Sequence, residues 1–132
     1  MQRRPLIHEQ LTRSIIGAFY EVYNTLGFGF LEEVYSTAME VELRARGHTV
    51  GREVWVPVFY KGLRLKRQRM DMLVDDKVIV ENKSTVKLPE STPYQLRSYL
   101  HSTPIQVGLI LHFGLIPKLH RFIWTDQRGR SA

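Results

Sequence analysis

The sequence predicts an α/β fold, in which helices pack against a mixed β-sheet. Three features lead to this prediction. Apolar residues recur three or four positions apart through residues 7–46, which is the spacing of helices. They alternate at every second position after Gly47, which is the spacing of strands. A further helix then precedes a largely apolar run at residues 107–113, which predicts a buried strand.

The length and composition predict a single domain. The chain has 132 residues, a usual size for one domain. Its 43% of hydrophobic and 24% of charged residues are an ordinary globular balance, and no repeat or linker divides it. We expect one domain over residues 1–132, with an ordered core at about residues 6–124 and frayed polar ends.

Composition excludes several kinds of site. The chain has no cysteine, which excludes disulfides, thiolate zinc sites and cysteine nucleophiles. Its longest apolar run, residues 107–113, is too short to span a bilayer, and its first residues lack the layout of a signal peptide. We therefore expect a cytoplasmic protein with no membrane partner.

The chain is basic, with 19 Lys and Arg against 13 Asp and Glu and a net charge of +6. Its pI is near 9.8. Such a charge attracts polyanions through its long-range field and through counterion release. A soluble protein with a positive surface explains the same numbers equally well. Basicity is therefore compatible with nucleic-acid binding without establishing it.

Two helices are predicted first. One covers about residues 7–26, with Pro5 at its entry and Gly27 at its exit. The other covers about residues 31–46, and Gly47 follows as its stop signal. The inward face of this second helix is expected to consist of Leu31, Val34, Tyr35, Ala38 and Met39.

A three-stranded meander is predicted next. Its strands cover about residues 53–60, 63–74 and 77–83, with turns at Lys61-Gly62 and Asp75-Asp76. Pro57 indicates that the first strand has an unpaired side. Turns this short require antiparallel pairing.

The last third predicts a helix and one or two strands. The helix covers about residues 93–102, with Pro93 at its first position. The strand at residues 107–113 can join the sheet in parallel through this crossover. A short strand follows at about residues 119–124. The predicted order is α-α-β-β-β-α-β, with one further strand at the end.

The hairpin around Asp75-Asp76 carries the candidate chemistry. A three-residue turn centred on Asp76 would place Asp71 directly opposite Glu81, with Cβ atoms about 4.5–5.5 Å apart. Carboxylates at that distance repel unless a cation lies between them, and oxygen ligands suit Mg²⁺ or Mn²⁺. Lys83 shares the face of Glu81. Two solvated surface charges are the alternative, but an adjacent lysine in a strand of Val and Ile favours a site.

Four motifs follow one another along the chain. Residues 29–35 read GxxExxY, Asp71 is a strand acid, Glu81-Asn82-Lys83 reads (D/E)XK, and residues 95–99 read QxxxY. Together they resemble the GxxExxY group and, through it, the PD-(D/E)XK nuclease superfamily, with the QxxxY motif of its RecB and lambda-exonuclease branch. The resemblance implies a restriction-endonuclease-like α-β-β-β-α-β core, preceded here by an extra helix.

The resemblance also implies roles for individual residues. Metal ligands would come from Glu32, Asp71, Glu81 and the backbone carbonyl of Asn82. Lys83 would orient the attacking water and balance charge in the transition state. Gln95 and Tyr99, one helical turn apart, would hold the substrate phosphate or a metal-bound water.

Two further positions, Tyr35 and Asn82, bear on the site. Tyr35 is grouped with the nucleic-acid contacts as a support for Glu32, although core packing is the favoured alternative. Asn82 departs from the family, which usually has an apolar residue between the acid and the lysine. Its side chain is expected on the face opposite Glu81, where the sheet is buried.

A basic stretch precedes the predicted site. Five of the nine residues from Lys61 to Arg69 are Lys or Arg. Alternation sends Arg67 and Arg69 to the face of Asp71, with Lys66 beside them, where they could attract phosphate. A solvated strand face explains the stretch equally well.

The sequence therefore predicts a Mg²⁺- or Mn²⁺-dependent nuclease that hydrolyses DNA. The QxxxY motif tilts the substrate toward ends or single strands, and RNA stays open. A dimeric junction-resolving or restriction-like endonuclease and a non-catalytic nucleic-acid-binding protein are the alternatives. Cleavage polarity and oligomeric state are not determined by the sequence.

Overall fold

The computed structural model describes residues 6–125. Three helices flank a five-stranded sheet: α1 (Glu9–Leu26), α2 (Glu32–Ala45) and α3 (Ser91–Ser102). The strands of the main sheet are β1 (Val50–Val56), β4 (Gln68–Val74), β5 (Val78–Lys83), β6 (Val107–Phe113) and β7 (Pro117–Ile123). A separate hairpin consists of β2 (Phe59–Tyr60) and β3 (Leu63–Arg64).

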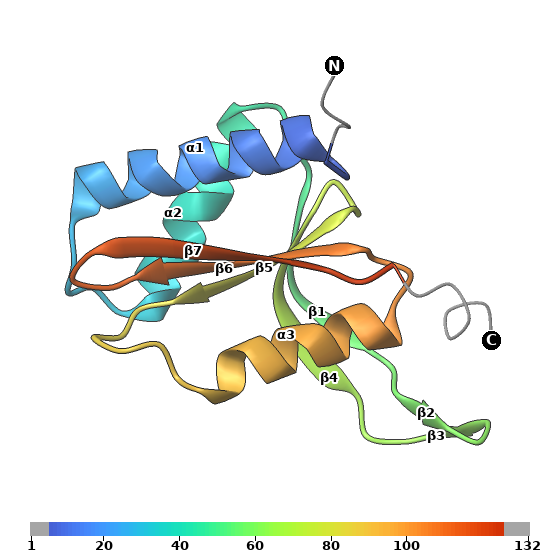
Figure 1. Cartoon of the computed structure of the whole chain (residues 1–132). Helices are drawn as coiled ribbons and strands as arrows, with labels where there is room; N and C mark the ends of the chain where they lie inside the picture. The colour runs from blue at the N-terminus through green and yellow to red at the C-terminus, as the bar shows by residue number, and fades with distance from the viewer. Residues whose placement is uncertain (1–5, 126–132) are drawn as a thin grey trace, which may run out of the picture.

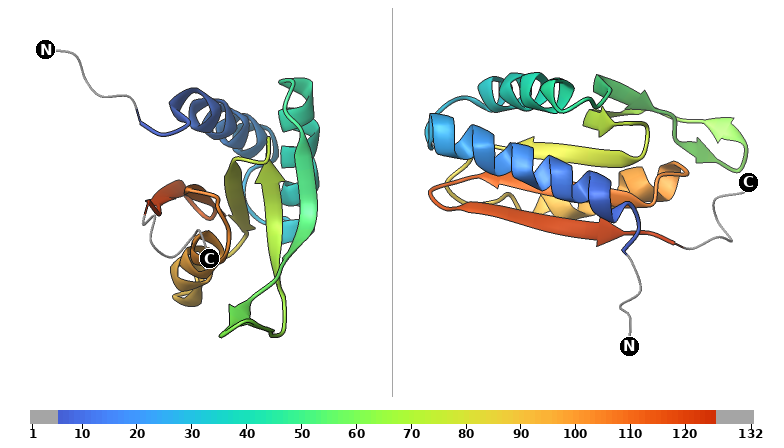
Figure 2. Two further views of the ribbon diagram at one scale, coloured as in Figure 1. Left: turned by 90° about the vertical axis from the view of Figure 1, so that its right-hand side faces the viewer. Right: turned by 90° about the horizontal axis from the view of Figure 1, so that it is seen from above.

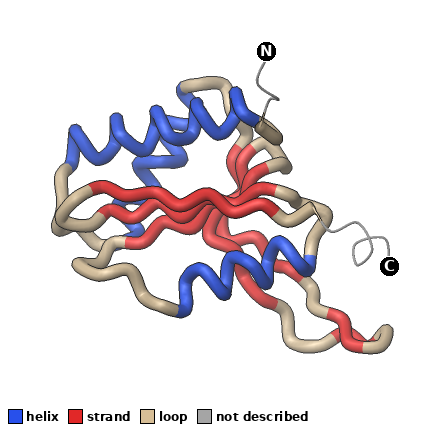
Figure 3. Tube along the Cα trace, viewed as in Figure 1, coloured by secondary structure: helices blue, strands red, loops and turns tan. Residues whose placement is uncertain are grey.

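The sheet has the order β1-β4-β5-β6-β7. Only β5 and β6 pair in parallel, through the α3 crossover, and the other neighbours are antiparallel. Helices α1 and α2 lie on one side of the sheet and α3 lies on the other (Figures 1 and 3). The predicted mixed α/β class, the antiparallel meander and the parallel crossover are confirmed, as is the additional last strand.

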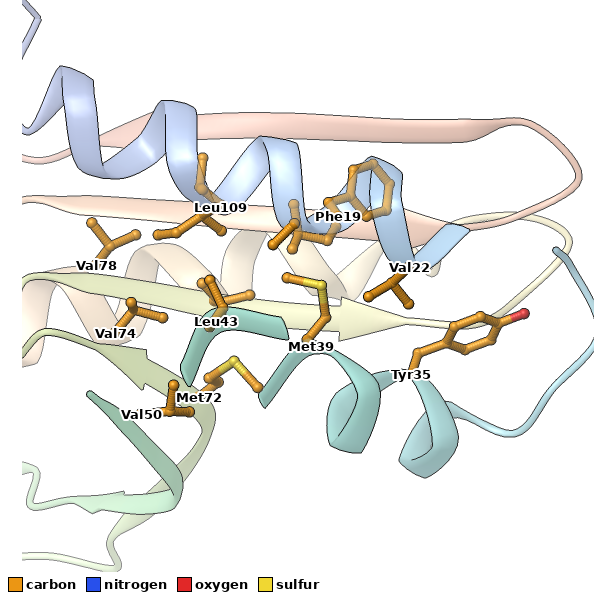
Figure 4. Close-up of a cluster of buried hydrophobic side chains, with 14 of the residues drawn as sticks. Phe19, Val22, Tyr35, Met39, Leu43, Val50, Met72, Val74, Val78 and Leu109 are labelled. Carbon is orange, nitrogen blue, oxygen red and sulfur yellow. The ribbon is translucent and has the colours of Figure 1, made fainter. Parts of the chain in front are cut away.

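The core has two parts, one on each side of the sheet. Phe19, Met39 and Leu43 of α1 and α2 pack on one face, with strand residues such as Val78 (Figure 4). Leu96, Tyr99 and Leu100 of α3 pack on the other, against Ile79 and Ile110. Every residue of β6 is buried between the two.

Gly108 of β6 lets α3 approach the sheet. A Cβ atom at this position would lie 2.7 Å from Leu96 Cδ1, which is closer than the two atoms tolerate. A side chain there would force Leu96 to shift. The close packing of Leu96 of α3 on β6 therefore depends on the absence of a side chain at Gly108.

The second helix turns a different face inward from the one predicted. Its buried residues are Tyr35, Ser36, Met39 and Leu43. Leu31 is 80% exposed and Val34 is 38% exposed, so both were wrongly assigned to the core face. The face of α2 that packs on the sheet includes the buried Ser36. A pattern of apolar residues does not indicate this face, because serine is polar.

The predicted bounds of two strands and of the third helix also needed correction. The first two long strands are each broken, because the tip of their ribbon forms the separate β2–β3 hairpin and Pro57 lies in the gap between β1 and β2. Helix α3 begins at Ser91, so Pro93 is its third residue. Gly27 and Gly47 do follow their helices with positive φ. Pro5, the expected entry to the first helix, lies outside the described residues.

A chain of side chains fastens the β4–β5 turn to α1. The Asp75 carboxylate accepts the Thr49 N–H at 2.8 Å and lies 2.7 Å from His48 Nδ1. His48 Nε2 lies 2.7 Å from Ser14 Oγ. These residue types match a serine-hydrolase triad, but Ser14 lies within α1. The N–H groups around it are used by the helix, so they cannot form an oxyanion hole.

These linked side chains form a structural tie with a pH dependence. Partial burial alone would raise the pKa of the Asp75 carboxyl, but the Thr49 N–H and the His48 ring outweigh it and lower that pKa. A carboxyl whose pKa is lowered by folding stabilises the folded state at any pH above its ordinary pKa. This stability is lost as pH falls through the folded-state pKa.

We expect Asp75→Asn to lower the free energy of unfolding at neutral pH by about 1 kcal/mol and to make its acid decline shallower than that of the wild type. Asp76→Asn is the matched control, because Asp76 has the same positive-φ backbone and is exposed. Urea unfolding from neutral pH to below about pH 4 measures both slopes. Equal behaviour of the two variants would contradict the tie.

Candidate active site

The main sheet is interrupted at Asp71. Strands β1 and β4 pair from Val50↔Val74 to Val56↔Gln68, but Glu53 and Asp71 are not paired. Glu53 has φ 54°, a left-handed conformation that L-residues rarely adopt and that breaks the ladder. On its other side, β4 pairs with β5 only as far as Met72↔Val80. That register confirms the predicted three-residue turn centred on Asp76.

The Asp71 carboxylate replaces the missing ladder contact. Its Oδ2 accepts both the backbone N–H and the Nδ2–H of Asn82, each at 3.0 Å. Ser36 Oγ of α2 donates to the same oxygen at 3.3 Å. Three donors therefore fix the orientation of this acid before any ligand arrives.

The contacts of the Asn82 side chain explain why a polar residue stands between Glu81 and Lys83. It is fully buried, and its Nδ2 bridges Asp71 and Ser36 Oγ. Within residues 6–125, its Oδ1 has no hydrogen-bond partner. The buried face expected for this side chain is what the structure shows.

One open cavity of about 370 Å³ contains the candidate residues. We call it the acidic pocket, and its lining consists of Glu32, Glu33, Ser36, Glu53, Arg69, Asp71, Glu81, Lys83, Gln95 and Tyr99. All six residues predicted as catalytic from the sequence line it. They come from α2, β4, β5 and α3, which are distant in sequence.

Glu32 reaches this pocket because the end of β5 is fastened to the turn before α2. Ser84, next to Lys83, donates its hydroxyl to the Phe30 carbonyl at 2.6 Å. Burial raises the pKa of Glu32, and the Asp71 charge adds to this rise. The Lys83 ammonium and the Ser84 N–H oppose it. Glu32 is thus electrostatically coupled to both strand residues.

Glu81 is the most perturbed acid of the pocket. Burial, followed by the charges of Asp71 and Glu32, raises the pKa of Glu81 to about 8, although Lys83 opposes the shift. Without a bound cation, Glu81 therefore holds a proton at neutral pH. Among the described residues, Lys83 forms no ion pair within 4 Å, although its charge acts on Glu32 and Glu81 at longer range.

Tyr99 holds α3 against β4 at the edge of the pocket. Its ring is buried, and its hydroxyl donates to the Arg69 carbonyl at 2.8 Å. Burial and then the Glu81 charge raise the pKa of Tyr99 to about 12, so the hydroxyl stays protonated. Gln95, one turn earlier, lines the pocket.

Tyr35 is a core residue, which corrects its grouping with the nucleic-acid contacts. It is fully buried, and its ring stacks on Phe113 with centroids 4.3 Å apart. Its hydroxyl donates to the Gly27 carbonyl and accepts the Phe30 N–H. The tyrosine of the GxxExxY motif therefore closes the turn that precedes Glu32.

The basic stretch does not lie on one strand as predicted. Arg69 lies on β4 and lines the acidic pocket. Lys66 and Arg67 lie in the loop between β3 and β4, outside the pocket lining, and the Arg67 guanidinium covers the Trp55 ring. Sequence reasoning also missed Glu33 and Glu53, because Glu33 occupies a variable position of the GxxExxY motif and Glu53 belongs to no motif.

The donor set fits a hard cation, although its members are not gathered in advance. Carboxylate oxygens are the ligands that Mg²⁺ and Mn²⁺ prefer. Within residues 6–125, no three His, Asp or Glu side chains are already grouped closely enough to hold an ion. The acids surround the pocket, and an ion would have to draw them together.

Comparison with known proteins gives one family. The sequence profile of the PD-(D/E)XK nuclease superfamily matches residues 9–122. Neither a curated protein nor a solved structure gives a significant match. In the described part of the chain, no helix is long and apolar enough to cross a membrane.

The raised pKa of Glu81 has a consequence for stability. A carboxyl whose folded-state pKa is raised lowers the stability of the fold as pH rises from its ordinary value to about 8, because in this range the unfolded state releases the proton that the folded state still holds. In chelator, we expect Glu81→Gln to flatten this decline and to have a higher Tm than the wild type above about pH 8. Thermal unfolding across this range measures the effect.

Glu90→Gln is the matched control for this measurement. Glu90 is exposed at the start of α3, and its side chain makes no capping hydrogen bond. Its replacement should leave the pH dependence unchanged. A wild-type Tm that does not fall with pH, or an equal response of both variants, would contradict the buried charge cluster.

Proposed function

Because the chain belongs to the PD-(D/E)XK nuclease superfamily, we propose that it is a metal-dependent nuclease that hydrolyses DNA phosphodiester bonds in the acidic pocket. The observation that carries the proposal is the meeting of Glu32, Asp71, Glu81 and Lys83 around one cavity. Three acids and a lysine at this place match the order of the superfamily motifs.

The metal site is the first part of the proposal. Glu32, Asp71, Glu81 and the carbonyl of Asn82 would hold Mg²⁺ or Mn²⁺. When bound, such an ion polarises the phosphate and lowers the pKa of water. Since ligation requires ionised carboxylates, Glu81 must release its proton, and binding should strengthen as pH rises toward 8.

The protein residues divide the remaining work. Lys83 supplies a positive charge beside the phosphate, where negative charge develops in the transition state. Asp71 is held by Ser36 and Asn82, so it is already oriented. Gln95 offers a neutral amide to the phosphate. Tyr99 acts as a positioning residue, because its hydroxyl is engaged by the Arg69 carbonyl.

A non-catalytic nucleic-acid-binding protein is the second candidate. The ungrouped state of the acids in the described structure favours it, because a binder needs no ready ion site. Nucleic-acid binding without metal-dependent cleavage would establish it. A dimeric endonuclease would instead cleave circular DNA and have twice the chain mass in solution.

We expect cleavage of labelled linear DNA with Mg²⁺ or Mn²⁺ and none with chelator. Lys83→Ala and Asp71→Asn should each lower the rate by at least about a hundredfold, because each removes a charge used in the transition state. Lys87→Ala and Asp76→Asn are the exposed controls. In parallel, Mn²⁺ should raise the Tm of the wild type more than that of Asp71→Asn.

Undiminished cleavage by folded Lys83→Ala would remove the nuclease assignment from this pocket. Equal Mn²⁺ shifts in both melts would place the ion elsewhere.

Binding is expected to be mostly electrostatic, because Arg69 lines the pocket and Arg67 lies nearby. Affinity should fall steeply with salt in chelator, where cleavage is stopped. Replacing both arginines by Ala should flatten the slope of log affinity against log salt by about 0.7–0.9 for each phosphate that is no longer neutralised. The control with the same charge change is Arg13→Ala with Lys118→Ala, on α1 and β7. An equal change in slope for both pairs would show that only net charge matters.

A further inference from the structure

Three exposed aromatic residues lie within six positions of one another in the chain, at the outer end of β1 and on the β2–β3 hairpin. Trp55, near the end of β1, is 50% exposed, while Phe59 and Tyr60 on β2 are 61% and 57% exposed. The β2–β3 hairpin projects from the main sheet, as Figures 1 and 2 show. We call Trp55, Phe59 and Tyr60 the aromatic platform. Leaving such rings in water forgoes the gain of burial, so three large exposed rings in one short segment indicate a contact surface.

Cationic side chains lie over these rings. The guanidinium groups of Arg67 and Arg69 lie 4.4 Å and 5.7 Å from the Trp55 ring centroid. Lys61 Nζ lies 5.3 Å from the Tyr60 centroid. The platform is therefore both aromatic and positively charged.

Between Glu53 and Asp71, the segment that carries these rings contains no acid. Residues 54–70 include five Lys or Arg and no Asp or Glu. Within the described chain, Arg69 reaches the nearest acid, Glu53, only at 3.9 Å, and both side chains are more than half exposed. An exposed ion pair at that distance adds little stability and leaves most of the Arg69 charge available to a ligand. A partner for this surface must then be an anion that also offers flat apolar faces.

The platform is continuous with the acidic pocket through Arg69. This residue lines the pocket and is the cross-strand partner of Trp55. The Tyr99 hydroxyl donates to the Arg69 carbonyl and so fixes the backbone at this point. A ligand stacked on Trp55 would therefore have its charged backbone next to the pocket entrance.

We propose that the aromatic platform stacks the unpaired bases of a single-stranded nucleic acid, whose backbone continues past Arg69 into the acidic pocket. This inference rests on the proposed nuclease function and gives its substrate class. In a duplex, neighbouring base pairs cover the faces of each base, so a duplex could use only the cations. A single strand can use the rings and the cations together.

The first test measures binding in chelator, so that cleavage plays no part. The probes are labelled oligothymidine, alone and as its duplex with oligoadenine, followed by fluorescence anisotropy. Trp55→Ala should weaken single-strand binding by roughly tenfold or more and duplex binding far less. Trp55→Phe keeps a stacking ring and should restore most of the affinity. Tyr20→Ala is the control, since Tyr20 is a partly exposed aromatic residue on α1.

The second test reads the contact directly and does not depend on the Ala variant folding. The chain has two tryptophans, so Trp124→Phe leaves Trp55 as the only one. Oligothymidine should quench the Trp55 emission at saturation, and the duplex should quench it much less.

Unchanged Trp55 emission, or an equal weakening of single-strand and duplex binding in Trp55→Ala, would overturn the platform. A wild-type dimer that Trp55→Ala converts to a monomer would also overturn it, because the surface would then bind a second copy of the chain. Cleavage of the same probes with Mn²⁺ separates the two proposals. Stacking without cleavage would keep the platform and remove the nuclease, whereas cleavage without stacking would do the reverse.

Discussion

The arrangement of the site depends on the interruption of the sheet at Asp71. A regular ladder would pair this backbone on both sides and leave its carboxylate no part in the sheet. Because pairing with β5 stops at Met72, the Asn82 N–H needs another acceptor, and Asp71 Oδ2 provides it. The candidate ligand is thus also a component of the sheet. Truncating Asp71 to Ala would leave buried donors unpaired, at about 1–3 kcal/mol each, whereas Asn keeps an acceptor oxygen.

The pocket is rich in acidic residues, whereas the chain as a whole is basic. Several carboxylates gather in a protein whose net charge is +6. Part of the repulsion is relieved by the Lys83 ammonium, and part by the proton on Glu81, whose pKa burial raises to about 8. The proton is replaceable by a cation, since a bound ion takes its place between the acids. The metal-free pocket therefore holds a charge pattern that favours a divalent ion near neutral pH.

Much of the fold could be predicted from residue patterns, because turns and short connections are determined by neighbouring residues. The positive-φ turn at Asp75-Asp76 set the register that brought Asp71 and Glu81 to the same level, and the crossover rule set the direction of β6. The break at Glu53 could not be predicted, because glutamate carries no signal for positive φ. The inward face of α2 was misjudged because it includes the polar Ser36, which is buried and donates a hydrogen bond to Asp71. No sequence pattern predicted the platform, and only the structure pairs Trp55 with Arg69 at the pocket.

The same break disturbs the alternation of side chains along β4. Met72 and Met70 are two positions apart on β4 and should share a face. Met72 instead packs in the core beneath α1 and α2, and Met70 packs beneath α3. The β1–β4 ribbon therefore turns over between them, at Asp71. Its inner half is built into the core, and its outer half presents Trp55 and the hairpin to solvent. A single left-handed residue at Glu53 thus accompanies two changes at once, since it frees the candidate ligand and reorients the ribbon that extends beyond it.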